Sequence, residues 1–308
     1  MKKFFFILAL VAALAAGAAW LLSAPRPLYP GEDWRAFEAG GDAEAGRIVF
    51  NIGGCESCHA TPDQPDPLRL GGGLELKTPF GSFYPPNISP DPNDGIGGWK
   101  TLDLANALMS GVSPQGQHYY PALPYTSYER LRLTDVRNLM AFLRTLPAVP
   151  GRSPAHRLVF PFSIRRGVGF WKLLYLDGAR IDADPGKSAA WNLGRYLVEG
   201  PGHCAECHSP RDVFGGIVAS RRFAGGPTPD GKGRAPNITG SGLAKWSRAD
   251  IAEALSSGIT PDGDSLGGAM AGVVRNTAQL PADYREAIAE YLKSLPPIDA
   301  PGAAAKSP

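Results

Sequence analysis

Two pentapeptides, CESCH at residues 55–59 and CAECH at residues 204–208, contain all four cysteines of the chain. Cys-x-x-Cys-His is the attachment signature of c-type haem. On one helical turn, two thiols meet the two vinyl groups of one porphyrin, and the adjacent histidine presents its imidazole to the iron. The pattern predicts two covalently bound haem c groups, with thiols and proximal ligands from Cys55, Cys58 and His59 for the first haem and from Cys204, Cys207 and His208 for the second.

Three other uses of paired cysteines account less well for the two pentapeptides. A structural disulfide in an exported protein has no need of a histidine directly after each pair. A zinc site needs four well-placed ligands, and the two pairs lie about 149 residues apart. A thioredoxin-type redox pair would stand near a βαβ pattern, which the sequence lacks.

The two haem boxes lie in an internal repeat. The stretch AGRIVFNIGGCESCHA matches LGRYLVEGPGHCAECHS, and GGWKTLDLANALMSGVSPQG matches AKWSRADIAEALSSGITPDG. An offset of 147 residues aligns Trp99 with Trp246, and both are expected to pack on a domain core. Each repeat predicts three short helices: one that runs into the box, one over DLANAL or DIAEAL, and one over VRNLMAFLRTL or REAIAEYLKSL. Ser247 and Asp250 are an expected capping pair.

The N-terminus begins Met-Lys-Lys and continues as an uncharged run from Phe4 to Leu22. A helix of these 19 residues is about 28 Å long, close to the thickness of a bilayer core. The lysines before the run predict that the remainder lies outside the cytoplasm. A cleaved signal peptide is the alternative, but its apolar region is shorter and ends in small residues. We therefore expect an inner-membrane anchor with the haem domains in the periplasm.

Both repeats resemble cytochrome c domains, and together they resemble the haem-binding subunits of membrane-bound bacterial alcohol and gluconate dehydrogenases. The resemblance rests on the two boxes and on PPNISPDPNDGIGGW, APNITGSGLAKW, YPALPY and MAGVVRN. This chain differs from those subunits in two respects. Those subunits carry three haem boxes where this chain has two, and Leu123 stands where many relatives have methionine.

The repeat and the resemblance predict an all-α fold with two tandem cytochrome c domains after an N-terminal transmembrane helix. Domains this small have little core of their own, so the haems would supply much of the apolar centre. The 151–190 segment mixes aromatic and basic residues; we expect it to pack across both domains, with docking to a partner or to lipid headgroups as the alternative. The expected divisions are residues 1–24 (membrane anchor or signal segment), 37–150 (domain one), 151–190 (interdomain strap), 191–298 (domain two) and 299–308 (disordered tail).

The ligand on the far side of each iron is expected from the loop between the second and third helices. In repeat two this Gly-rich loop contains Met270, and a thioether ligand raises the potential of haem iron. The same register puts Leu123 in repeat one, and leucine is not a ligand. His118, five residues earlier, is the candidate there; a surface histidine, a loop tyrosine as ligand and an open iron are the alternatives. Met109 and Met140 are interpreted as core side chains.

Asn87 and Asn237 occupy equivalent places in two PNI stretches. In this class of fold such asparagines hold haem propionates or loop backbone, and turn chemistry alone would also explain them. Both are therefore candidate residues at the haem edge.

Charge and residue types exclude some classes of function. The 31 Lys and Arg residues nearly balance 29 Asp and Glu, which argues against a nucleic-acid partner. No acid–base or nucleophilic constellation stands beside the boxes. We expect a dihaem cytochrome that relays electrons from a periplasmic dehydrogenase to a terminal oxidase, a quinone-linked complex or a small cytochrome of the respiratory chain. The alternative is a dihaem enzyme, a peroxidase or an oxidoreductase of small sulfur species, with an open site at the first haem.

Overall fold

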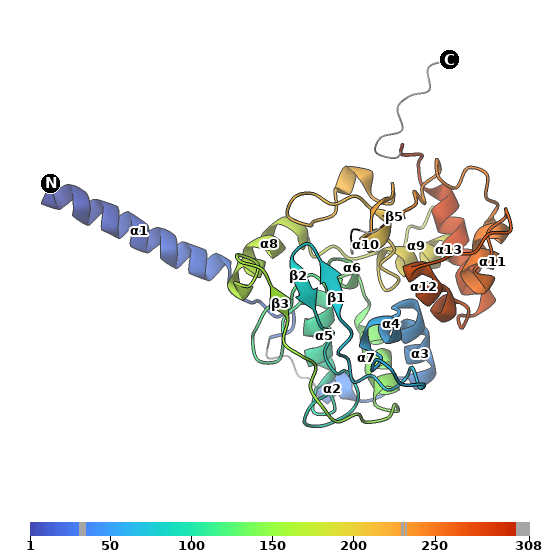
Figure 1. The fold of residues 1–308 in the computed structure, drawn as a ribbon, viewed down its shortest axis with the longest axis horizontal. Coiled ribbons are helices and arrows are strands. Elements are labelled where there is room, and N and C mark those ends of the chain that lie inside the picture. The colour runs from blue at the N-terminus through green and yellow to red at the C-terminus, as the bar shows by residue number, and fades with distance from the viewer. Residues whose placement is uncertain (31–34, 229–230, 232, 300–308) are drawn as a thin grey trace, which may run out of the picture.

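The computed structural model describes residues 1–30, 35–228, 231 and 233–299, and this part is mostly helical (Figure 1). The first half contains α1 (Lys2–Leu22), α2 (Arg35–Glu38), α3 (Ala43–Ile52), α4 (Cys55–His59), α5 (Thr101–Ser110), α6 (Tyr125–Tyr128) and α7 (Leu133–Leu143). The remainder contains η1 (Arg165–Gly167), α8 (Val168–Tyr175), α9 (Ala189–Glu199), α10 (Ala205–His208), η2 (Ala219–Arg221), α11 (Arg248–Ser257), α12 (Ala269–Thr277) and α13 (Ala282–Ser294). Of the tail expected to be disordered, 300–308 lie outside the described residues.

Equivalent helix pairs form the centre of each repeat. Helix α3 packs against α7, and α9 packs against α13. A Cβ atom at Gly46 would lie 1.9 Å from the backbone oxygen of Asn138, and one at Gly194 would lie 1.9 Å from that of Ala287. Both crossings therefore depend on glycine, because any side chain would collide with backbone of the partner helix.

Each repeat buries its own hydrophobic cluster. Trp99 packs against the first cluster and Trp246 against the second, which confirms the prediction for both tryptophans. Met109 and Met140 are fully buried in the first cluster, which confirms that they are core side chains. Ile52 of the first repeat belongs to the second cluster, so the two halves also share apolar contacts.

The second helix of each repeat has matching ends. Ser247 and Asp250 form the predicted capping box at the start of α11. Helices α5 and α11 end at Gly111 and Gly258, whose φ angles of 60° and 78° are left-handed and favour glycine. The repeat in the sequence is therefore a repeat in backbone conformation.

Two small antiparallel sheets add to the helical architecture that the sequence predicts. One has the order β1 (Leu76–Thr78), β2 (Gly81–Phe83), β3 (Arg157–Leu158), and the other pairs β4 (Gly226–Pro227) with β5 (Arg234–Ala235). Strands of two or three residues are too short to produce a recognisable alternation of apolar and polar residues in the sequence. Because β3 lies in the 151–190 segment and pairs with β2, that segment is fastened to the first repeat.

Helix α1 projects away from the rest of the molecule (Figure 1). None of its residues is buried, and among the described residues it is the helix that is long and apolar enough to cross a membrane. A signal sequence satisfies the same criterion of length and composition. Helix α8 lies at its base, where a Cβ atom at Gly169 would meet the backbone oxygen of Ser23 at 2.4 Å.

Candidate haem-binding sites

The two boxes form short helical turns in equivalent surroundings. Nδ1 of His59 donates to the carbonyl oxygen of Pro86 at 2.8 Å, and Nδ1 of His208 donates to that of Pro236, also at 2.8 Å. A carbonyl only accepts, so the bond fixes the proton on Nδ1 and leaves the lone pair of Nε2 for a metal. The donor set therefore fits a haem iron at each box.

The protonation state of the two box histidines suits the same role, because neutral imidazole is the form that binds a metal. Burial lowers the pKa of His59 and of His208, which keeps both imidazoles neutral. Burial raises the pKa of Cys55 and of Cys204 to about 12. None of the four cysteines forms a disulfide, so each thiol is available for a thioether bond.

Asn87 and Asn237 hold the loops that carry the two proline carbonyls. The Asn87 amide donates to the carbonyl oxygens of Val149 at 2.6 Å and Gly151 at 2.9 Å. The Asn237 amide donates to the carbonyl oxygen of Ile298 at 2.6 Å. Both amides thus fasten the segment after the last helix of their repeat, which is the loop-backbone role; contact with a haem edge stays a prediction.

Met270 lies in helix α12 rather than in an irregular loop, so the expectation of a loop was wrong at this point. The helix begins at Ala269, directly after Gly268 with a φ of 59°, and Gly272 of the Gly-rich stretch lies within it. Met270 is half-buried and is its second residue. Its role as an iron ligand stays a prediction.

In the first repeat, Leu123 and His118 lie in different surroundings. Leu123 packs against the first hydrophobic cluster, as Cys55 does. His118 is buried and its Nε2 donates to the backbone oxygen of Ser23 at 2.9 Å, at the base of α1. Its Nδ1 is buried without a hydrogen-bond partner in the described structure. His118 is therefore not a surface histidine, and iron ligation by it would require Nδ1 or a change of partner.

The two repeats exchange hydrogen bonds through their boxes, a contact that no sequence pattern predicts. The hydroxyls of Thr126 and Ser127, in α6, each donate to Oε1 of Glu206 in the second box at 2.9 Å. Conversely, the amide of Asn276, in α12, donates to the hydroxyl of Ser57 in the first box at 3.1 Å. Helices α6 and α12 therefore each form hydrogen bonds with the box of the other repeat.

The residues just before the two boxes also meet, at one backbone oxygen. Burial raises the pKa of the Cys58 thiol, and the charge of Cys207 raises it further. The hydroxyl of Tyr128 donates to the backbone oxygen of Gly53, just before the first box, and Nε2 of His203, just before the second, donates to the same oxygen; both distances are 3.2 Å. The fold thus brings together two sites that are far apart in the sequence.

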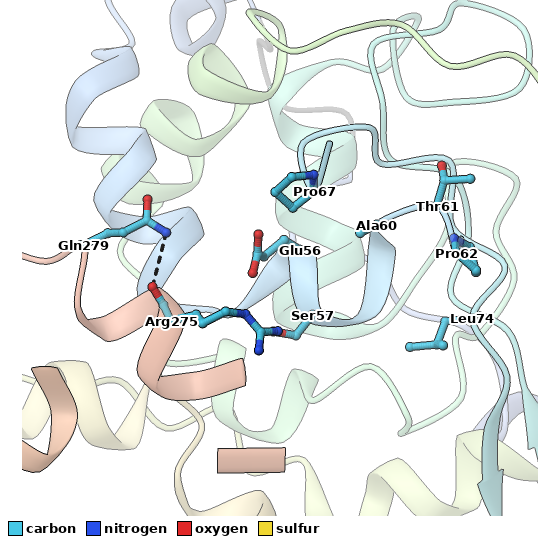
Figure 2. Close-up of a pocket in the computed structure, with 9 residues that line it drawn as sticks. All are labelled: Glu56, Ser57, Ala60, Thr61, Pro62, Pro67, Leu74, Arg275 and Gln279. Carbon is cyan, nitrogen blue, oxygen red and sulfur yellow. Dashed lines mark hydrogen bonds between the residues drawn. The ribbon is translucent and has the colours of Figure 1, made fainter. Parts of the chain in front are cut away.

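A surface pocket lies behind the first box (Figure 2). Glu56, Ser57 and Ala60 line it from the α4 turn, and Arg275 and Gln279 line it from α12 and the residues just after it. Cys55, Cys58 and His59 are absent from its lining. The residues between the cysteines, Glu56 and Ser57, therefore face α12 of the second repeat, where the amide of Asn276 contacts both.

No protein-family model matches the chain. A diheme cytochrome c-type protein of Cereibacter sphaeroides is 50% identical over 294 residues, which are 95% of this chain and 97% of that protein. The chain belongs to the diheme c-type cytochromes. This membership makes it an electron-transfer cytochrome with haem c cofactors, as the boxes predict.

Further relatives of this dihaem cytochrome are subunits of dehydrogenases. The fructose dehydrogenase cytochrome subunit of Gluconobacter japonicus is 36% identical over 247 residues, which are 79% of this chain and 50% of that protein. The cytochrome c subunit of alcohol dehydrogenase (quinone) of Gluconobacter oxydans is 34% identical over 265 residues, which are 82% of this chain and 54% of that protein. The cytochrome spans about half the length of these two subunits.

Proposed function

We propose that this dihaem cytochrome is anchored in the inner membrane by α1 and relays electrons in the periplasm from a dehydrogenase to the respiratory chain. The observation that carries the proposal is the contact between the two boxes: His203, just before the second box, donates to the backbone oxygen of Gly53, just before the first, and hydrogen bonds from Thr126 and Asn276 cross between the repeats. Two redox sites in series are useful only when they are near each other.

Two tandem cytochrome c domains, 37–150 and 191–298, would each hold one haem. The thiols of each box would bind it covalently, and Nε2 of the box histidine would bind the iron. Haem iron supplies a one-electron store that alternates between ferrous and ferric states. The chain contributes orientation, because the carbonyls of Pro86 and Pro236 hold the imidazoles in one tautomer and one plane.

The dehydrogenase as electron donor is supported by the relatives, whose names describe cytochrome subunits of fructose, alcohol and gluconate dehydrogenases. The acceptor would be a terminal oxidase, a quinone-linked complex or a small cytochrome. Lys2 and Lys3 before the apolar run support an orientation with the haem domains in the periplasm.

One observation favours a second function. Leu123 stands where Met270 stands in the other repeat, and the Nε2 atom of His118 is occupied by Ser23 at the base of α1. An iron without a sixth protein ligand would leave the first site open to a small molecule. The cytochrome would then be a dihaem peroxidase or an oxidoreductase of small sulfur species.

Carbon monoxide binding to the reduced, haem-loaded protein separates the two functions. If neither haem binds carbon monoxide, both irons have two firm protein ligands and the relay stands. A His118→Ala variant that then gains binding would identify His118 as the sixth ligand of the first haem. If one haem binds carbon monoxide readily, the first site is open, and peroxide and small sulfur compounds become the substrates to test.

A further inference from the structure

Helix α8 is amphipathic, but its apolar side is exposed and its charged residue is buried. Phe170, Leu173 and Leu174, at positions i, i+3 and i+4 and hence on one side of the helix, are 42%, 55% and 69% exposed. On the other side, Val168 and the charged Lys172 are buried at 8% and 9% exposure. A helix on the surface of a soluble protein normally has the opposite arrangement.

Lys172 fixes this orientation. Its ammonium group donates to the carbonyl oxygens of Ser110 at 2.6 Å and Gly111 at 2.7 Å, where α5 ends. The carbonyls at a helix C-terminus carry partial negative charge, so they offset part of the cost of burial, which lowers the pKa of Lys172 to about 7. Trp171 adds a second bond, from Nε1 to the backbone oxygen of Phe214 at 3.0 Å. Because both bonds would be lost on rotation, α8 cannot turn its apolar side inward.

Further apolar side chains flank α8. Phe160 and Ile164, which precede it in the 151–190 segment, are 79% and 52% exposed, and Phe214, beside Trp171, is 61% exposed. We call the set Phe160, Ile164, Phe170, Leu173, Leu174 and Phe214 the strap face. Exposed apolar side chains on one helix face and on the segments next to it are typical of a site that is covered by a partner or by a membrane.

The strap face adjoins the candidate membrane helix. Nε of Arg166, two residues before α8, donates to the hydroxyl of Ser23 at 3.0 Å, and its guanidinium group lies 4.0 Å from the centre of the Trp20 ring. Gly169 on the buried side of α8 contacts Ser23 backbone. Figure 1 shows α8 at the point where α1 leaves the globular part. A bilayer around α1 would therefore reach its surface beside α8.

We infer that the strap face lies in the interfacial region of the bilayer that α1 crosses, so that lipid covers Phe170, Leu173 and Leu174. The inference rests on the proposed membrane anchoring. Continuity with α1 favours lipid as the occupant, and Trp20 next to Arg166 is a pair typical of the boundary between acyl chains and headgroups. Two attachments, one through the bilayer and one on its surface, would hold both haem domains in one orientation above the membrane.

Photo-crosslinking of the full, haem-loaded chain in nanodiscs tests the inference. The discs contain phosphatidylcholine with a diazirine in the acyl chain and phosphatidylglycerol, and the adducts are located by peptide mass spectrometry. We expect lipid adducts in α1 and in Val168–Tyr175, and none in α13, which lies at the opposite end of the molecule (Figure 1). The double substitution Leu173→Glu with Leu174→Glu should lose the α8 adducts and keep those in α1. Ile259→Glu, at an apolar position of the second repeat that is 48% exposed, should change neither.

The outcomes separate the inference from the proposal on which it depends. Adducts in α1 with α8 as unlabelled as α13 would overturn the inference and leave the anchor in place. The strap face would then be open to a protein partner such as the dehydrogenase. Absence of adducts from α1 as well would overturn the anchoring itself, whereas the haem absorption spectrum would report independently whether the cytochrome is intact.

Discussion

The imidazoles of His59 and His208 are each held by a hydrogen bond to one backbone carbonyl. The two repeats differ at the position expected on the far side of each iron. Met270 offers a thioether at the start of α12, and Leu123 offers only apolar surface. If Met270 is the iron ligand that we predict, this difference of one residue at equivalent positions changes how many protein ligands each iron has and how accessible it is.

Met270→Leu gives the second repeat the residue of the first. We expect the reduced variant to bind one more carbon monoxide per chain than the wild type, because the substituted side chain cannot ligate iron. The number is measured by titration, following the absorption of the reduced protein. Met109→Leu, a matched substitution in the buried core, should leave the number unchanged. An unchanged number in Met270→Leu would show that another residue is the ligand.

Glu129 makes a residue-scale contribution to stability that depends on pH. Burial raises the pKa of its carboxyl to about 7 from the usual 4.5, although the charge of Arg130 and the N–H of Gly178 both oppose the shift. The nearby Asp177 carboxylate raises it further. Between these two values the folded state binds the proton more tightly than the unfolded state, so the free energy of unfolding should fall as pH rises from about 4.5 to about 7.

Urea unfolding across this pH range measures the effect. Glu129→Gln, which is neutral throughout, should remove that part of the pH dependence. Asp283→Asn, at an exposed position, is the control and should leave it in place. The same slope in wild type and Glu129→Gln would mean that the carboxyl titrates normally.

At the scale of elements, the close crossings α3–α7 and α9–α13 define each repeat. Gly194→Ala would place a methyl group 1.9 Å from the backbone oxygen of Ala287, so α9 and α13 must separate. We expect a loss of about 1–3 kcal/mol or more in the free energy of unfolding, as for other overpacked contacts. Denaturant unfolding measures it. Gly167→Ala, where a Cβ atom meets nothing within 4 Å, is the control; equal effects of the two substitutions would contradict the packing argument.

The main helices and both boxes could be predicted from the sequence, because the alignment of two repeats makes every local signal appear twice. Ser247 with Asp250 and the paired tryptophans are examples that the structure confirms. Helix α12 could not be predicted from the sequence, because glycine is a poor helix former and tertiary contacts stabilise this helix. Asn276, fully buried, bonds to Ser57 of the other repeat. The pairing of β3 with β2, which attaches the 151–190 segment to the first repeat, could not be predicted either, because a strand of two residues leaves no pattern in the sequence.

At the scale of the whole molecule, the two haem-binding repeats interlock rather than follow one another as separate units. Glu206 receives hydrogen bonds from α6 of the other repeat, and Ile52 packs in the other repeat's core. No local pattern marks such contacts, because they join residues about 80 positions apart or more that only the fold brings together. The proposed relay would depend on these long-range contacts, since the distance between the two boxes is set by the interface between the repeats.

The double substitution Thr126→Val with Ser127→Ala tests how much this interface contributes. It removes both hydroxyl donors to Oε1 of Glu206, whose other oxygen keeps its ion pair with Arg211 at 2.6 Å. Because Glu206 is largely buried, water cannot fully replace the lost donors, and we expect a loss of about 1.5–3 kcal/mol in the free energy of unfolding. Thr145→Val, which removes an exposed hydroxyl bonded within its own repeat, should cost less. Equal losses in urea titrations followed by far-ultraviolet circular dichroism would mean that the Glu206 hydrogen bonds do not hold the repeats together, and the spacing of the boxes would then have to be explained by the bond of Asn276 to Ser57 and the packing of Ile52 and its neighbours.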